Sequence, residues 1–88
     1  MPDHTQAAAE RLDVLEGLLT AIERRHELID LLSACASVDT AVREVVDTFG
    51  VTEPAARVVL DTQFRRLLPQ QVEGLRAEAA ELRAALGR

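Results

Sequence analysis

The sequence predicts an all-α protein of about four helices, in which an antiparallel two-helix coiled-coil stalk carries a small helical knob. The first reason is composition: 48% of the 88 residues are hydrophobic, yet only Phe49 and Phe64 are aromatic, as is typical of packed helices. The second is periodicity, because apolar residues recur at helical spacing near both ends and no segment alternates as a strand would. The third is the scarcity of Gly and Pro, which leaves few places for the chain to turn.

The first helix is expected over residues 5–36. Its seam follows the alternating three- and four-residue spacing of a coiled coil, at Leu12, Leu15, Leu19, Ile22, His26 and Ile29. Further leucines widen that stripe towards the C-terminal half, at Leu18, Leu28, Leu31 and Leu32. The helix should therefore begin as a narrow arm and end embedded in a broader core.

Two shorter helices are expected next. The first covers residues 39–49, and its apolar face is Val42, Val45, Val46 and Phe49. Gly50 then ends it in a left-handed conformation. The following helix starts after Thr52, whose hydroxyl is a preferred N-cap, and runs to about Leu68. Pro69 stops it because proline lacks the backbone N–H that a helix interior needs.

The last helix is expected over residues 69–86, with the same seam spacing as the first. At about 1.5 Å per residue its reach of roughly 27 Å matches the arm part of the first helix, so the two should pair antiparallel. Within one domain, residues 1–88, we predict arms over residues 5–30 and 70–86 and a knob over residues 31–69. The predicted stalk seam is Leu12, Leu15, Leu19, Ile22, Leu75, Ala79, Leu82 and Leu86.

The third helix carries consecutive apolar residues, Val58, Val59 and Leu60, which cover more than half of a helix circumference. Such a helix needs apolar neighbours on two sides. The chain's own helices could enclose it, or a second copy could cover one side; we favour the second copy because so small a module has few elements. The expected dimer interface is Ala55, Val58, Val59 and Thr62. The expected knob core is Val42, Val46, Phe49, Ala56, Leu60, Phe64 and Leu67.

Charge and composition disfavour several classes of protein. The net charge of −5 argues against a nucleic-acid backbone or an anionic membrane as the main partner. The single Cys35 excludes an intramolecular disulfide and fits a reducing compartment. Neither a signal peptide nor an apolar run of transmembrane length is visible, so we expect a cytoplasmic protein.

Residue types that carry chemistry do not converge in the sequence. His26 lies on the seam, far from His4, and Cys35 has no Cys or His partner at useful spacing. Asp61 is expected to pair with Arg57 or Arg65, each four residues away on one helix face. No Ser-His-Asp set and no Gly-rich phosphate loop can be assembled. We therefore predict no catalytic residue, no metal and no cofactor.

Several blocks of sequence carry a recognisable pattern. They are Arg11-Leu12-Asp13-Val14-Leu15-Glu16-Gly17-Leu18-Leu19 with Ala21-Ile22, then Phe49-Gly50-Val51-Thr52-Glu53 with Ala56, and Val59-Leu60-Asp61 with Arg66-Leu67. These blocks and their spacing resemble the A-subunit family of DNA gyrase and topoisomerase IV, specifically its coiled-coil segment and exit-gate knob. The resemblance covers nearly the whole chain but only a small internal part of that subunit.

The resemblance implies a knob whose two copies meet across a two-fold axis, as the lower dimer contact of a topoisomerase. It does not imply strand cleavage, since the family's catalytic centre needs a nucleophilic tyrosine and the sequence has none. The chain departs from the family pattern at Arg25, where an apolar residue is usual. It departs again at Thr62-Gln63, in place of Met-Arg, and at Leu68-Pro69, in place of Thr-Gly.

The leading hypothesis is a non-catalytic homodimeric interaction module, whose candidate partners are a second copy and a gyrase-type A subunit. The alternative is a small helix-turn-helix DNA-binding regulator, because the segment from Val45 through Gly50 to Val59 resembles the turn of that motif. Its recognition helix would offer base edges little beyond Arg57. DNA is therefore a disfavoured partner, and no membrane partner is expected.

Overall fold

The structure, a computed structural model, describes residues 4–88. In order these residues form α1 (His4–Glu23), α2 (Arg25–Ser33), α3 (Val38–Phe49), α4 (Glu53–Asp61), a short 3-10 helix η1 (Phe64–Leu67) and α5 (Pro69–Leu86). No strand occurs within this range. The prediction of an all-α fold is confirmed.

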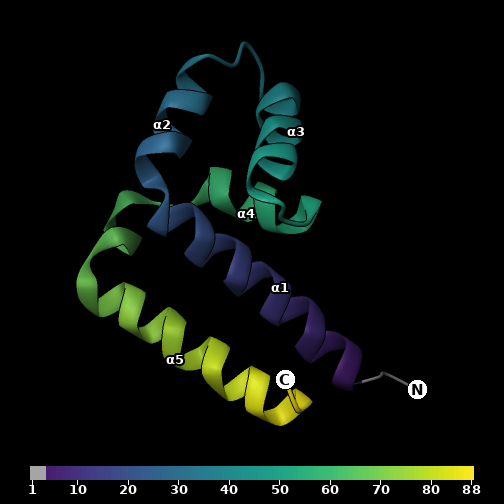
Figure 1. Ribbon diagram of the computed structural model, residues 1–88. Helices are drawn as coiled ribbons and strands as arrows, with labels where there is room; N and C mark the ends of the chain where they lie inside the picture. Colours follow the sequence, from purple (N-terminus) through teal and green to yellow (C-terminus); the bar gives the residue numbers. More distant parts are fainter. Residues whose placement is uncertain (1–3) are drawn as a thin grey trace.

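Helix α1 lies at the centre of the molecule. Helix α5 runs antiparallel along one side of it, so that the start of α1 and the end of α5 lie at the same end (Figure 1). Helix α4 crosses the other side of α1, and α2 and α3 rise from there as a pair joined by a short loop (Figure 1). A coiled-coil geometry for the α1–α5 pair stays a prediction.

Two clusters of buried side chains form the core. The larger joins α1, α4 and α5 and consists of Leu12, Leu15, Leu18, Leu19, Ala21, Ile22, Val59, Leu75 and Ala79. The smaller joins α3 and α4 and consists of Val42, Val45, Phe49 and Ala56. Val59, from the expected knob, thus lies in the same cluster as the expected arms, and arms and knob share one core.

The first helix breaks at Arg24, whereas the sequence predicted one helix over residues 5–36. Arg24 has φ −108° and ψ 36°, outside the helical region, and α2 begins after it. Its guanidinium lies 4.4 Å from the centre of the Phe49 ring and also donates to both carboxylate oxygens of Glu27. The break turns α2 towards α3 (Figure 1). Phe49, which Arg24 contacts, lies too far along the sequence for a periodic pattern to reveal the contact.

The third helix also ends earlier than predicted, at Asp61 rather than near Leu68. Thr62 and Gln63 are extended, with ψ 131° and 146°. The Thr62 hydroxyl donates to the carbonyl of Val58 at 2.7 Å, while the Thr62 N–H bonds to the carbonyl of Val59, one residue short of the α-helical pattern. Phe64 therefore does not continue the α4 register, and η1 carries it in a different direction.

Helix ends follow the local signals more closely. Ser37 and Thr52 accept hydrogen bonds from the backbone N–H groups of Thr40 and Ala55, each at 3.2 Å, and so cap α3 and α4. Gly50 ends α3 with φ 67°, the left-handed value that glycine adopts without a steric penalty. Pro69 occupies the first turn of α5 rather than a helix interior.

Ion pairs tie α5 to α1 in a single antiparallel register. Arg11 donates to both carboxylate oxygens of Glu78, at 2.8 and 3.3 Å. Arg83 and Arg76 on α5 reach Glu16 and Glu23 on α1 at 3.7 and 3.9 Å. The hydrogen bond from Arg11 holds the pKa of Glu78 below its usual value.

Candidate functional site

The residues expected to form the dimer interface lie mostly inside the protein. Ala55 is fully buried and Val59 is 6% exposed, while Thr62 is half-buried and Val58 is 38% exposed. Helix α4 crosses α1 where Gly17 faces Ala55. A Cβ atom added at Gly17 would lie 2.6 Å from the Cβ of Ala55, so only glycine lets the helices approach this closely. Ala55 and Val59 therefore do not present an exposed patch, contrary to the expectation.

The physical reason is that one chain supplies neighbours on both sides of α4. Val59 packs into the cluster with α1, and Ala56 packs into the cluster with α3, where Leu60 also makes contact. Val59 and part of Leu60 are thus enclosed as ordinary core, the alternative that the sequence left open, whereas Val58 stays 38% exposed. Val58 and part of Thr62 are what the expected interface leaves accessible, so a dimer contact through them stays a prediction.

The other predicted residues divide into those placed in the core and those placed outside it. In the core clusters or against them lie Leu12, Leu15, Leu19, Ile22, Leu75, Ala79, Leu82, Leu86, Val42, Val46, Phe49, Ala56 and Leu60. Phe64 and Leu67, expected in the knob core, are 83% and 37% exposed. They are corrections to the prediction, because the break after Asp61 removes them from the buried stripe of α4.

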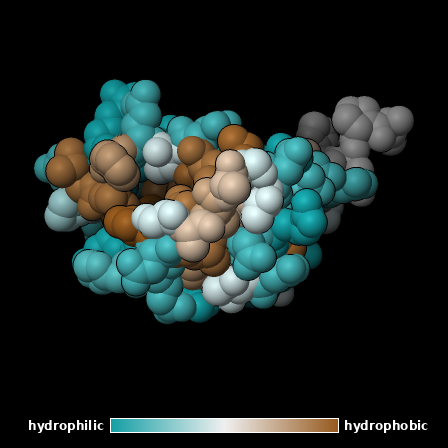
Figure 2. Space-filling view, turned by 90° about the horizontal axis from the view of Figure 1, so that it is seen from above, coloured by the Kyte–Doolittle hydropathy of each residue, from teal (hydrophilic) through white to brown (hydrophobic). Residues whose placement is uncertain are grey.

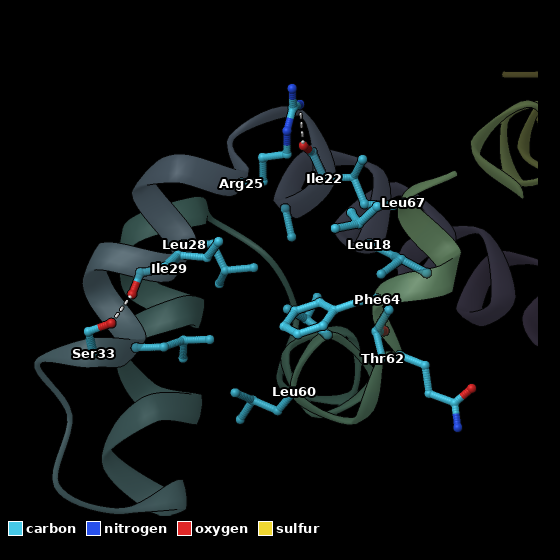
Figure 3. A pocket seen from close by; sticks show the side chains of 14 residues that line it. Leu18, Ile22, Arg25, Leu28, Ile29, Ser33, Leu60, Thr62, Phe64 and Leu67 are labelled. Atoms are coloured by element: carbon cyan, nitrogen blue, oxygen red, sulfur yellow. Dashed lines mark hydrogen bonds between the residues drawn. The ribbon is translucent and has the colours of Figure 1, made fainter. Parts of the chain in front are cut away.

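An apolar groove of about 350 Å³ opens between α2 on one side and the end of α4 with η1 on the other. Leu18 and Ile22 of α1 lie at its base, Leu28 and Ile29 belong to the α2 side, and Leu60, Phe64 and Leu67 to the opposite side (Figure 3). Arg25 is the one charged residue in the lining, and its guanidinium donates to the carbonyl of Ile22 at 3.4 Å. The groove is therefore suited to apolar groups.

The largest exposed hydrophobic side chains gather at this groove. Ile29, Phe64 and Leu67 line it and Leu68 directly follows η1; all four are among the six large hydrophobic residues that are most exposed in residues 4–88. Figure 2, which looks down on this end of the molecule, shows hydrophobic side chains around a hollow. Clustering of this kind marks an interaction site more often than scattered exposed residues do.

Charged residues of α2 and η1 lie near the groove, but Arg25 is the one that lines it. Helix η1 carries Arg65 and Arg66 beside Phe64, and neither guanidinium pairs with another described residue. Helix α2 carries Glu27 and Asp30 as well as Arg25. Glu27 is held by Arg24, which lowers the pKa of Glu27 through their hydrogen bonds, whereas Asp30 has no partner among the described residues.

The residues weighed for chemistry lie apart. His26 is exposed, and the Cys35 thiol donates to the carbonyl of Leu31 at 3.3 Å. Arg57 pairs with Glu53 at 2.9 Å rather than with Asp61, and Asp61 has no ion-pair partner in residues 4–88, contrary to the expected pairing. Within the same range no three His, Cys, Asp or Glu side chains converge as metal ligands would, and no helix has the length and apolar character for a bilayer crossing.

The helix-turn-helix alternative gains no support from α3 and α4. The exposed face of α4 offers Glu53, Arg57, Val58 and Asp61, and its one guanidinium is already bound to a carboxylate. Major-groove recognition uses several free donors and acceptors near the start of the second helix.

Comparison with known proteins identifies relatives of this helical module. No family model matches the chain. Curated relatives are the DNA gyrase A subunits of Deinococcus deserti, 37% identical over 75 residues, and Dehalogenimonas lykanthroporepellens, 32% identical over 77 residues. The matches cover 85% and 88% of this chain but 9% and 10% of those subunits. The DNA gyrase A subunit of Campylobacter jejuni is 34% identical to this chain, and the match covers 94% of this chain and 10% of that subunit.

The chain is thus similar to a segment of the A subunit of DNA gyrase, and it spans about a tenth of the length of the relatives it matches. The resemblance stated from the sequence blocks is confirmed to that extent. The feature that sequence reasoning missed is the exposed Phe64 beside an apolar groove. No local signal marked the break, because Thr20 makes the same hydroxyl bond to the carbonyl of Glu16 within α1, which continues to Glu23.

Proposed function

We propose that the chain is a non-catalytic helical module that forms homodimers, in the manner implied by its resemblance to the exit-gate segment of gyrase-type A subunits. The single observation that carries the proposal is the uncovered apolar face formed by Ile29, Phe64, Leu67 and Leu68. A monomer gains nothing from holding so much apolar surface in water, whereas a second copy would remove it from water.

A non-catalytic role is supported by the amino-acid composition and by the residues that line the groove. Strand cleavage in the gyrase family needs a tyrosine nucleophile, and this chain has no tyrosine. The groove is lined mainly by aliphatic and aromatic side chains, with Arg25, Ser33, Thr62 and Gln63 as its polar residues, and this lining suits packing rather than proton or acyl transfer. By the same resemblance we place the module in the cytoplasm.

Sedimentation velocity at tens of micromolar tests self-association. We expect the wild-type chain to form dimers and Phe64→Asp to remain monomeric and helical by circular dichroism, because a side chain that is 83% exposed contributes little to the fold. Val38→Asp is the matched control: Val38 is 67% exposed, lies outside the groove, and should leave the dimer intact. A monomeric wild type would remove the proposal.

The surface expected from the sequence is tested in the same series. Val58, 38% exposed, is the most accessible of the apolar residues first expected at the interface. If Val58→Asp were monomeric while Phe64→Asp formed dimers, the contact would lie on α4 rather than around the groove.

A gyrase-type A subunit is the second partner that we propose, on the strength of the similarity alone. The purified gyrase protein, immobilised on a sensor surface, should retain the wild-type chain and lose Phe64→Asp, with Val38→Asp as the control. Absence of binding at micromolar concentration would exclude this partner and leave the homodimer untouched.

A further inference from the structure

We infer that two copies of this chain exchange Phe64, each ring entering the apolar groove of the other copy. The inference rests on the proposed homodimer and names the contact that would hold it. One chain carries both a projecting group and a groove that fits it: a phenyl ring that is 83% exposed, and an apolar groove of about 350 Å³.

The groove has room for the ring. A cavity of roughly 150 Å³ lined by Leu, Ile and Phe accommodates benzene, so 350 Å³ accepts a phenyl ring together with part of a neighbouring aliphatic side chain. Leu28, Ile29 and Leu60 present methyl groups to that space (Figure 3). Apolar walls gain from an aromatic occupant without leaving a buried polar group unpaired.

Reciprocity follows from where Phe64 stands. Phe64 is itself one of the residues that line the groove, so the ring and the groove of one copy are neighbours. In a two-fold dimer both partners use the same patch. When the inserted ring is adjacent to the receiving groove, both exchanges can form at once across a nearby axis. A ring far from the groove would instead favour open-ended assembly.

The local backbone keeps the ring available. Phe64 starts a four-residue 3-10 helix between the extended residues Gln63 and Leu68, and no residue of η1 is buried. Phe64 therefore lies outside the chain's own core and lines the groove with a ring that stays exposed.

The area that could be buried fits a second copy. An enclosed aromatic side chain buries roughly 150–250 Å². Counting both rings and the walls that receive them, the exchange supplies roughly 600 Å², and Ile29, Leu67 and Leu68 extend it towards the roughly 1,000 Å² that a specific interface needs.

Photo-cross-linking decides where Phe64 goes. An unlabelled chain with p-benzoylphenylalanine in place of Phe64 is mixed with ¹⁵N-labelled wild type, irradiated and digested. We expect cross-links from position 64 to the α2 segment Arg25–Ser33 of the labelled copy. Cross-links to another part of the labelled copy would overturn the exchange while leaving the homodimer in place, and cross-links confined to the same chain would show that the ring closes its own groove.

A complementation assay tests reciprocity. Phe64→Ala removes the inserted ring and keeps the groove, whereas Ile29→Asp blocks the groove and keeps the ring. Each variant alone should dimerise at least about thirtyfold more weakly than wild type, as expected for a central aromatic contact. A mixture of the two restores one exchange and should associate more tightly than either variant alone.

The assay separates the two proposals. A mixture that associates no better than its components would contradict the exchange, provided that the wild type is a dimer. If the wild type is a monomer at tens of micromolar, the homodimer and the exchange fall together.

Discussion

The inner helices and the walls of the groove are built differently, although they belong to one small chain. Helices α1, α3, α4 and α5 contribute every fully buried residue of residues 4–88, whereas α2 and η1 contribute none. The inner helices interlock at Gly17 and Ala55, and the walls rest on the core through partly buried leucines such as Leu28.

The same contrast appears in the polar contacts. The pair Arg11–Glu78 joins residues 67 positions apart and ties two helices, but the pair Arg24–Glu27 acts within one turn. Side-chain caps begin α3 and α4, and none begins α2, η1 or α5. Elements with few buried contacts open most easily, and binding surfaces are commonly drawn from them. The difference teaches that this chain secures its own core and leaves its least anchored segments around the groove.

The largest effect that would break this comparison concerns core packing. Leu12 is fully buried, so Leu12→Ala should lower the free energy of unfolding by about 2–5 kcal/mol through lost burial and the cavity left behind. Ile29 on α2 is 52% exposed, so Ile29→Ala should cost well under half as much. Urea unfolding of both variants provides the measurement; equal losses would mean that α2 is as firmly packed as α1.

The second effect isolates the crossing of α1 and α4. Gly17→Ala forces a methyl group to within 2.6 Å of the Ala55 Cβ and should destabilise the protein by about 1–2 kcal/mol net of its better helix propensity. At about 4–8 °C per kcal/mol, the melting temperature should fall visibly. Gly74→Ala is the control, because a Cβ there meets nothing within 4 Å, and it should raise stability by about 0.5–1 kcal/mol. A rise for both variants would refute the close approach.

The third effect concerns the side-chain caps of α3 and α4, which α2 and η1 lack. Thr52→Ala removes the hydroxyl that accepts from the Ala55 N–H and should cost about 1 kcal/mol. Gln63, at the corresponding position before η1, makes no such bond, so Gln63→Ala should be nearly neutral. Thermal melts of the two variants test the difference, which would vanish if the Thr52 cap contributed nothing.

The smallest effect is a dependence of stability on pH. The pKa of Glu78 is lowered by the hydrogen bond from Arg11, so the unfolded state binds the proton more tightly than the folded state does. The stabilisation is present above the ordinary glutamate pKa of 4.5 and is lost as pH falls below it. Since both side chains are about half exposed, we expect only a few tenths of a kcal/mol.

Glu78→Gln should therefore flatten the loss of stability between neutral pH and acid, as measured by urea unfolding at a series of pH values. Glu27→Gln is the matched control. Its partner Arg24 lies three residues away, so we expect a smaller change in global unfolding. An unchanged acid profile in Glu78→Gln would show that the pair does not bind the two helices together.

Local sequence determined the elements whose causes are local. The all-α class, the cap at Thr52, the left-handed Gly50 and the start of α5 at Pro69 follow from the chemistry of a few adjacent residues. The apolar spacing that predicted the stalk seam also marks residues that lie in or against the larger core cluster.

Tertiary structure alone decided which apolar residues stay buried. The pattern of α4 is compatible with a partner helix from the same chain or from another, and only the crossing at Gly17 selects the same chain. Arg24, where the first helix breaks, contacts Phe49, a residue 25 positions away, and the break after Asp61 turns Phe64 out of the buried stripe. Periodicity records how often a helix shows an apolar side, but which surface meets that side depends on contacts between residues far apart in sequence.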